Sequence, residues 1–175
     1  MTSNIECHLL IDGRQWSPTV AGWLHREWYA ARGTLLPEMQ RQLEQRSNRR
    51  SLPLAAVALR DGTAIGTASL VSYECPAVHP EPRCFLADVY VLPPCRGQGV
   101  ATTLCRWMIE TARQLGLPEL FVMTARPPLL YKRLGWRVVQ ENLAGPRARN
   151  VTMMVLPLST EGEAGQEANT AVRTQ

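Results

Sequence analysis

The clearest hydrophobic periodicity in the chain begins at Val100, where apolar residues return every three or four positions. The apolar positions are Val100, Leu104, Trp107, Met108, Ile109, Ala112 and Leu115. This spacing places them on one face of an amphipathic helix. Gly116 stands where a left-handed cap is expected and Pro118 follows two residues later, so the helix is predicted to end near Leu115.

Apolar and β-branched runs elsewhere predict strands rather than helices. The predicted strands are 6–11, 54–59, 64–72, 84–91, 119–124 and 151–155. The pair Asp61-Gly62, between the second and third strands, is typical of a hairpin turn. The segment 73–83 contains Pro76, Pro80 and Pro82 and is predicted to be a loop.

Two more helices are predicted between the first and second strands. Ser17 is expected to cap the first of them, with Pro18 at its first position. The second runs from Pro37 or Glu38 to about Gln45. The aromatic residues of the first helix region are Trp16, Trp23, Trp28 and Tyr29. Core packing is the favoured interpretation of this aromatic face, and partial lining of a substrate pocket is the alternative.

A glycine-bearing loop, P-P-C-R-G-Q-G, joins the strand 84–91 to the helix at Val100. Backbone N–H groups at a helix start lack partners, and with the helix dipole they attract anions. Gly97 and Gly99 let the backbone approach a ligand closely. We therefore expect a phosphate or pyrophosphate here, with a plain flexible loop as the simpler alternative. The spacing matches neither the dinucleotide fingerprint nor a Walker loop.

Two motifs resemble those of the GNAT superfamily of N-acetyltransferases. The loop resembles the signature R/Q-x-x-G-x-G/A, with Arg96, Gly99 and Ala101 at its three defined positions. The later run L-Y-K-R-L-G-W is similar to the family's aromatic-Tyr-x-x-x-Gly-aromatic motif, with Leu130 in place of the commoner Phe before Tyr131. The resemblance spans residues 84–158.

The resemblance implies an α/β fold with a mixed, mostly antiparallel central sheet flanked by helices. Its fourth and fifth strands, here 84–91 and 119–124, would splay apart. Residues 1–158 would form one N-acetyltransferase domain, and the residues 159–175, poor in apolar side chains, are predicted to be a disordered tail. Acetyl-CoA is implied as co-substrate, with no metal. The implied cofactor-binding residues are Val89, Tyr90, Val91, Arg96, Gly97, Gln98, Gly99, Val100, Ala101, Thr102 and Thr124.

The implied reaction is direct transfer of acetyl from acetyl-CoA to an amine. Tyr131 resembles the family's general acid, which would protonate the leaving thiolate; packing against the cofactor arm is its alternative role. Backbone N–H groups near Val89 would stabilise the oxyanion. The base is left open: Asp88 is the first candidate, and Glu74, Tyr73 and a water chain are its rivals.

Strict alternation along the strand 84–91 makes a specific prediction about side-chain faces. It groups Asp88 with Leu86 and Tyr90, and Ala87 with Val89 and Val91. Which of the two faces meets the acceptor is left open.

Composition agrees with one domain of 175 residues, 45% hydrophobic, without an apolar run long enough to cross a membrane. A signal-peptide pattern is missing at the N-terminus, so a cytoplasmic location is expected. The five cysteines include no C-x-x-C pair and the three histidines have no ligand spacing, so reduced thiols and no metal site are expected. Cys95, beside Arg96, is interpreted as a loop residue rather than a nucleophile.

The net charge is +4, and four arginines cluster at the end of the second predicted helix, at Arg41, Arg46, Arg49 and Arg50. A solvated helix end is favoured over a patch for nucleic acid or an acidic partner. The expected partner is a small-molecule amine acceptor. The alternatives are a peptide or protein acceptor, at its N-terminus or a lysine, and a non-catalytic sensor that binds acyl-CoA. Assembly into a homodimer is left open.

Overall fold

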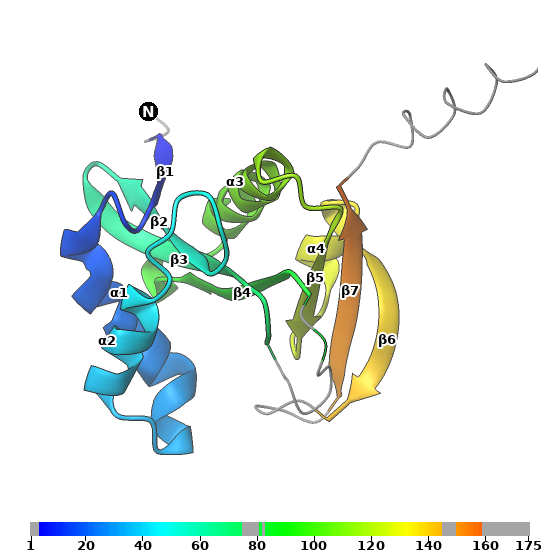
Figure 1. The fold of residues 1–175 in the computed structure, drawn as a ribbon, viewed down its shortest axis with the longest axis horizontal. Coiled ribbons are helices and arrows are strands. Elements are labelled where there is room, and N and C mark those ends of the chain that lie inside the picture. The colour runs from blue at the N-terminus through cyan, green and yellow to red at the C-terminus, as the bar shows by residue number, and fades with distance from the viewer. Residues whose placement is uncertain (1–3, 75–80, 82, 145–149, 159–175) are drawn as a thin grey trace, which may run out of the picture.

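The computed structural model describes residues 4–74, 81, 83–144 and 150–158 of the chain. Four α-helices and seven strands follow one another within these residues (Figure 1). They are β1 (Ile5–Leu9), α1 (Ser17–Leu24), α2 (Leu36–Glu44), β2 (Leu54–Arg60), β3 (Thr63–Val71), β4 (Phe85–Val91), α3 (Val100–Gln114), β5 (Glu119–Thr124), α4 (Leu129–Arg133), β6 (Arg137–Leu143) and β7 (Val151–Pro157).

The seven strands form one sheet in the order β1-β2-β3-β4-β5-β7-β6. All neighbours are antiparallel except β4 and β5, which are parallel. The pairing of β4 with β5 is confined to Phe85 and Phe121. Beyond that pair the two strands separate in the middle of the sheet. The predicted mixed, mostly antiparallel α/β fold with a splayed central pair is confirmed.

Helices cover the two faces of the sheet differently. One face of α3, with Val100, Leu104, Cys105, Met108, Ile109 and Ala112 buried, packs against β2 to β5 and β7 in the largest core cluster. On the opposite face, α1 and α2 pack against β2, β3 and β4 around Trp23, Leu24, Met39 and Leu43. Figure 1 shows α1 and α2 against the half of the sheet that contains β1 to β4. The line where β4 leaves β5 therefore lies beside this helical layer.

Several predicted boundaries are confirmed. The strand 119–124 and the start of α3 at Val100 match the structure, and Gly116 has the left-handed conformation of a helix cap, with φ 71°. Asp61 and Gly62 both have positive φ, 50° and 72°, as the predicted hairpin turn requires. The helix α4 contains Tyr131, as the motif implied.

The N-terminal segment differs from its prediction in three ways. The first strand ends at Leu9 rather than at residue 11, because turns begin there. Ser17 does not cap α1: a 3-10 turn over Arg14–Trp16 precedes it, so Ser17 already has helical angles and is the first helical residue. The third difference is that α2 begins at Leu36, one residue before Pro37. The first helix region does extend to Tyr29, as its aromatic face predicted, with a π-helical segment over His25–Tyr29.

Residues 75–80 and 82 of the predicted proline-rich loop, and the whole predicted tail 159–175, lie outside the described residues. Among the residues that the structure describes, no helix is long and apolar enough to cross a membrane. The described part of the chain also contains no cluster of histidine, cysteine or carboxylate side chains suited to a metal ion.

Candidate functional site

A β-bulge interrupts β4 where it leaves β5. Thr67 pairs with Tyr90, but two positions on Ser69 pairs with Ala87, so Asp88 and Val89 together oppose one residue of β3. Asp88 accordingly has φ 52°, a conformation that Asp tolerates better than most residues. A bulge leaves one residue without its ladder partner and turns side chains to a new face.

The bulge corrects the strict alternation predicted for this strand. Leu86, Val89 and Val91 pack on the side of α3, whereas Tyr90 packs on the side of α1 and α2. Asp88 shares the side of Tyr90 as predicted, but Leu86 does not. An extra residue in the strand shifts the two-residue period by one, and nothing local in the sequence marks it.

Asp88 is buried, with 4% of its surface exposed, and its carboxylate forms an ion pair with Arg46. The Arg46 guanidinium also donates a hydrogen bond to Ser69 Oγ at 2.9 Å, and the Tyr29 hydroxyl donates to Asp88 Oδ1 at 3.4 Å. Burial alone would lower the pKa of Arg46, but the adjacent Asp88 carboxylate and Tyr29 hydroxyl outweigh it and raise that pKa. The network therefore joins the segment just after α2 and the π-helical segment after α1 to β3 and the bulge of β4.

The arginine cluster predicted from the sequence is consequently not a single solvated patch. The Arg46 side chain is only 12% exposed and points into the sheet. Arg49, by contrast, forms an ion pair with Asp12 in which both side chains are well exposed. The favoured interpretation is wrong for Arg46, since helix periodicity cannot indicate that an arginine past the end of a helix reaches a buried aspartate.

The predicted anion site has the backbone that it needs. Gly97 and Gly99 have φ 74° and 83°, and a Cβ on either would meet no protein atom within 4 Å. Gly99 precedes the first residue of α3, and no side chain caps this helix. The first turn of α3, which contains Val100, Ala101 and Thr102, therefore has backbone N–H groups left for a ligand.

The two polar side chains of this loop are used within the protein. Gln98 donates to the Pro94 carbonyl at 2.9 Å and accepts from Arg60 at 2.6 Å. Arg96 donates through Nε to the Val91 carbonyl at 3.0 Å, and its guanidinium lies 5.8 Å from the centre of the Tyr90 ring. The side chains shape the loop, and its backbone faces outward.

A cavity of about 240 Å³ opens where β4 and β5 separate. It is lined by Trp28, Glu74, Leu86, Ala87, Asp88, Val89, Val122, Met123, Thr124, Ala125, Arg126, Tyr131 and Val151. Four residues predicted for the site, Asp88, Val89, Thr124 and Tyr131, are thus brought to one cavity. Glu74, a rival candidate for the base, lines it as well, whereas Tyr73 does not.

Tyr131 reaches the cavity from α4. Its ring meets the Trp136 indole edge-on, with the ring centroids 5.8 Å apart, so the second motif holds together as a packed pair. Burial, followed by nearby Cys105 and Glu74, raises the pKa of the Tyr131 phenol, and Arg126 opposes this only in part. The phenol therefore stays protonated at neutral pH and is available as a proton donor.

The side chains of two other predicted cofactor-binding residues, Thr124 and Tyr90, interact with other residues of the protein. The Thr124 hydroxyl accepts from the Arg126 N–H at 3.1 Å and faces the Arg126 carbonyl at 3.2 Å, which closes a local turn. The Tyr90 ring is buried, stacked on Trp23 with centroids 5.5 Å apart and meeting Trp28 edge-on. Trp23 is thus a core residue, as the favoured interpretation predicted, whereas Trp28 also lines the cavity, so partial lining of a substrate pocket stays a prediction.

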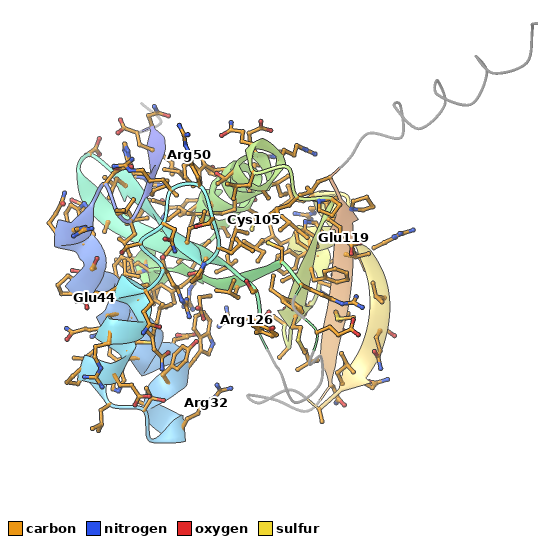
Figure 2. All side chains as sticks on the ribbon, in the orientation of Figure 1. Arg32, Glu44, Arg50, Cys105, Glu119 and Arg126 are labelled. Atoms are coloured by element: carbon orange, nitrogen blue, oxygen red, sulfur yellow. The ribbon has the colours of Figure 1, made fainter. Side chains whose placement is uncertain are left out.

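One acidic residue near the cavity had no signal in the sequence. Glu27, in the π-helical segment after α1, accepts a hydrogen bond from Arg126 at 2.8 Å and lies 3.9 Å from an Arg96 guanidinium nitrogen. Figure 2 shows Arg126 near the middle of the molecule, between the α1–α2 layer and β5. Glu27 therefore links the helical layer to the glycine loop that contains Arg96 and to the residues after β5.

The site agrees with the sequence comparison. The family model described as "Acetyltransferase (GNAT) family" matches residues 18–136, from α1 to the end of the second motif. The chain belongs to this acetyltransferase family. A comparison with curated protein sequences gave no match.

Solved structures with the same fold include several acetyltransferases. A GNAT acetyltransferase from Streptococcus pneumoniae has a TM-score of 0.65 and 16% identity over 89% of this chain and 100% of that one. The yncA acetyltransferase of Salmonella typhimurium, solved with acetyl-CoA, has a TM-score of 0.66 and 16% identity over 90% and 96%. An aminoglycoside 6′-acetyltransferase type Ii has a TM-score of 0.67 and 15% identity over 90% and 98%.

Proposed function

We propose that this protein is an N-acetyltransferase that transfers the acetyl group of acetyl-CoA to the primary amine of a small molecule. The observation that carries the proposal is the arrangement around the split between β4 and β5. An uncapped helix start with two open glycines lies at the end of β4, and the cavity between the strands contains a protonated tyrosine. The helix start with its glycines fits the phosphates of a donor, and the cavity with its tyrosine fits the site of acyl transfer.

The donor would bind along the split. Its pyrophosphate would accept hydrogen bonds from the backbone of Gly97, Gly99 and the first turn of α3. Its extended arm would occupy the gap between β4 and β5, where the two strands no longer pair with each other beyond Phe85 and Phe121. The thioester would then lie in the cavity beside the bulge.

The chemistry would use three groups of this chain. The amine nitrogen attacks the thioester carbon, the backbone at the bulge stabilises the oxyanion, and the C–S bond breaks as Tyr131 protonates the thiolate. An acceptor that arrives as an ammonium ion must lose one proton to solvent before it attacks, and the attacking amine must lose a second proton as the amide forms. The Asp88 oxygens contact Arg46 and Tyr29, so we assign proton acceptance to Glu74, which lines the same cavity. Solvent then returns a proton to Tyr131 and takes the proton from Glu74.

The lining of the cavity supports a cationic small molecule as acceptor. Trp28 and Glu74 give the cavity an aromatic and an acidic side chain that suit an ammonium group before deprotonation, and Arg126, which also lines it, is paired with Glu27. The volume of about 240 Å³ suits a small group rather than a folded surface. An aminoglycoside 6′-acetyltransferase among the similar folds is consistent with such an acceptor.

A screen of amines tests the proposal. The protein is incubated with acetyl-CoA and single amines, amino acids or peptides, and release of free CoA thiol is followed, with mass spectrometry of the acetylated product. We expect turnover with one class of small primary amine. Binding of acetyl-CoA without turnover on any amine would favour the sensor alternative, and turnover on peptides alone would identify a peptide acetyltransferase.

A further inference from the structure

We propose that Arg46 is a positioning residue, which acts through Asp88 to hold the β4 bulge so that its backbone polarises the thioester carbonyl of the donor. The inference rests on the proposed function and deepens it. It assigns to Arg46, which lies just beyond α2 and does not line the cavity, a role in the acyl-transfer step. It also gives Asp88 a role other than accepting the proton of the amine.

The first observation is an unfavourable backbone conformation in a buried place. Asp88 has φ 52° within a strand and is 4% exposed. A non-glycine residue in this region persists only where surrounding contacts hold it. Because Ala87, Asp88 and Val89 all line the cavity, this conformation determines how the backbone of the bulge faces a ligand there.

The second observation is that the contact holding Asp88 comes from outside its own hairpin. Arg46 binds the Asp88 carboxylate and the Ser69 hydroxyl with one nitrogen, so it connects the bulge to the facing strand β3. A buried carboxylate left without its cation would be strongly unfavourable. The ion pair therefore favours the one backbone orientation in which the Asp88 side chain reaches Arg46.

Three possible roles of the Arg46–Asp88 ion pair predict different experimental results. A pair that serves stability alone can be replaced by neutral residues without effect on the ligand, since such replacements are often neutral or stabilising. A catalytic base would make its contribution to turnover only, and not to the binding of the donor. A positioning role predicts an effect on the donor carbonyl itself, before any acceptor is present.

The experiment measures the infrared band of the acetyl carbonyl in acetyl-CoA labelled with ¹³C, free and bound to each variant. Melting temperature and the affinities for CoA and acetyl-CoA are measured on the same samples. The test variant is the double substitution Arg46→Met with Asp88→Asn, which removes both charges. A second variant, Arg46→Lys with Asp88 unchanged, keeps a cation at this position. The matched control is Arg49→Met with Asp12→Asn, the same chemical change in the exposed pair.

We expect the bound carbonyl band of the wild type to lie below that of free acetyl-CoA. The test variant should return the band at least halfway to the free position, with CoA affinity within about twofold, because CoA lacks the acetyl group. Arg46→Lys and the control pair should keep the wild-type band. If the double variant does not fold, Asp88→Asn alone is read in the same way, since Asn also tolerates positive φ.

Two results would overturn the inference and leave the proposed function intact. One is a carbonyl band that stays at the wild-type bound position in a folded test variant. The other is loss of turnover in Asp88→Asn with the band still at the wild-type bound position, which would identify Asp88 as the base. A wild type that binds neither CoA nor acetyl-CoA would instead overturn the proposed function, and this inference with it.

Discussion

Glu27 and Arg126 are separated by 99 positions in the sequence, yet the Arg126 guanidinium donates a hydrogen bond to the Glu27 carboxylate at 2.8 Å. The same carboxylate lies 3.9 Å from Arg96, which belongs to the glycine loop before α3. In the proposed binding mode, a negative charge at this place would oppose the approach of the pyrophosphate of the donor.

Glu27→Gln is expected to strengthen the binding of CoA by about twofold to tenfold, because it removes a carboxylate beside two arginines that an anionic donor approaches. The gain should shrink as salt is raised. Isothermal titration calorimetry with CoA at two salt concentrations measures both the gain in affinity and its dependence on salt. The control is Glu110→Gln, which changes the net charge equally but removes the exposed Glu110–Arg113 pair on α3. Equal gains in both variants would contradict a local effect.

Gly99→Trp is expected to weaken acetyl-CoA binding markedly, because the indole would fill the space that the loop leaves for a phosphate. Gly62→Trp is the matched control: Gly62 also has positive φ and open space around it, but lies in the hairpin between β2 and β3. Calorimetric titration of both variants separates loss of the site from backbone strain. Unchanged affinity for acetyl-CoA in Gly99→Trp would contradict the proposal that this loop binds a phosphate.

Tyr131→Phe is expected to lower kcat by more than tenfold with little change in KM for acetyl-CoA. General acids contribute about 10²–10⁴-fold, whereas loss of a neutral hydrogen bond costs about 0.5–1.5 kcal/mol, so the size of the effect separates the two roles. The phenylalanine ring keeps the edge-on contact with Trp136. A kcat within about threefold of the wild type, with chemistry rate-limiting, would leave Tyr131 only a packing role.

The raised pKa of Tyr131 adds a pH test to this prediction. The acid form is lost only above a pKa that burial has moved upward from 10.0. The activity of the wild type should therefore show no alkaline loss from this residue below pH 10. A decline centred near neutral pH that disappears in Tyr131→Phe would contradict the assignment.

Cys105→Ala is expected to change how stability depends on alkaline pH. Cys105 lies on α3 (Figure 2) and is fully buried. Burial raises the pKa of its thiol from 9.0 to about 12. Above pH 9 the unfolded thiol ionises while the folded one does not, so stability that is present below pH 9 is lost as pH rises toward 12.

The wild type should therefore lose about 1.4 kcal/mol more than Cys105→Ala between about pH 8 and pH 10. Urea unfolding of both proteins at a series of pH values, under reducing conditions, measures this difference. A constant difference across the range would show that the thiol ionises equally in both states.

Local signals in the sequence were enough for α3, the left-handed glycines of the loop before it and the hairpin at Asp61 and Gly62. Helical periodicity, turn chemistry and left-handed glycines act over a few residues, so the chain specifies them without its neighbours. The two motifs likewise predicted that Tyr131 and the loop at Gly99 belong to one kind of site.

Tertiary structure alone decided how the site is held. The extra residue at Asp88, its ion pair with Arg46 and the contact of Glu27 with Arg126 each join segments that are far apart in the sequence. Their energies come from burial and charge pairing, which exist only after α1, α2 and the sheet have packed. The sequence by itself thus determined which elements form and which family they resemble, while packing determined which charged groups meet beside the split between β4 and β5.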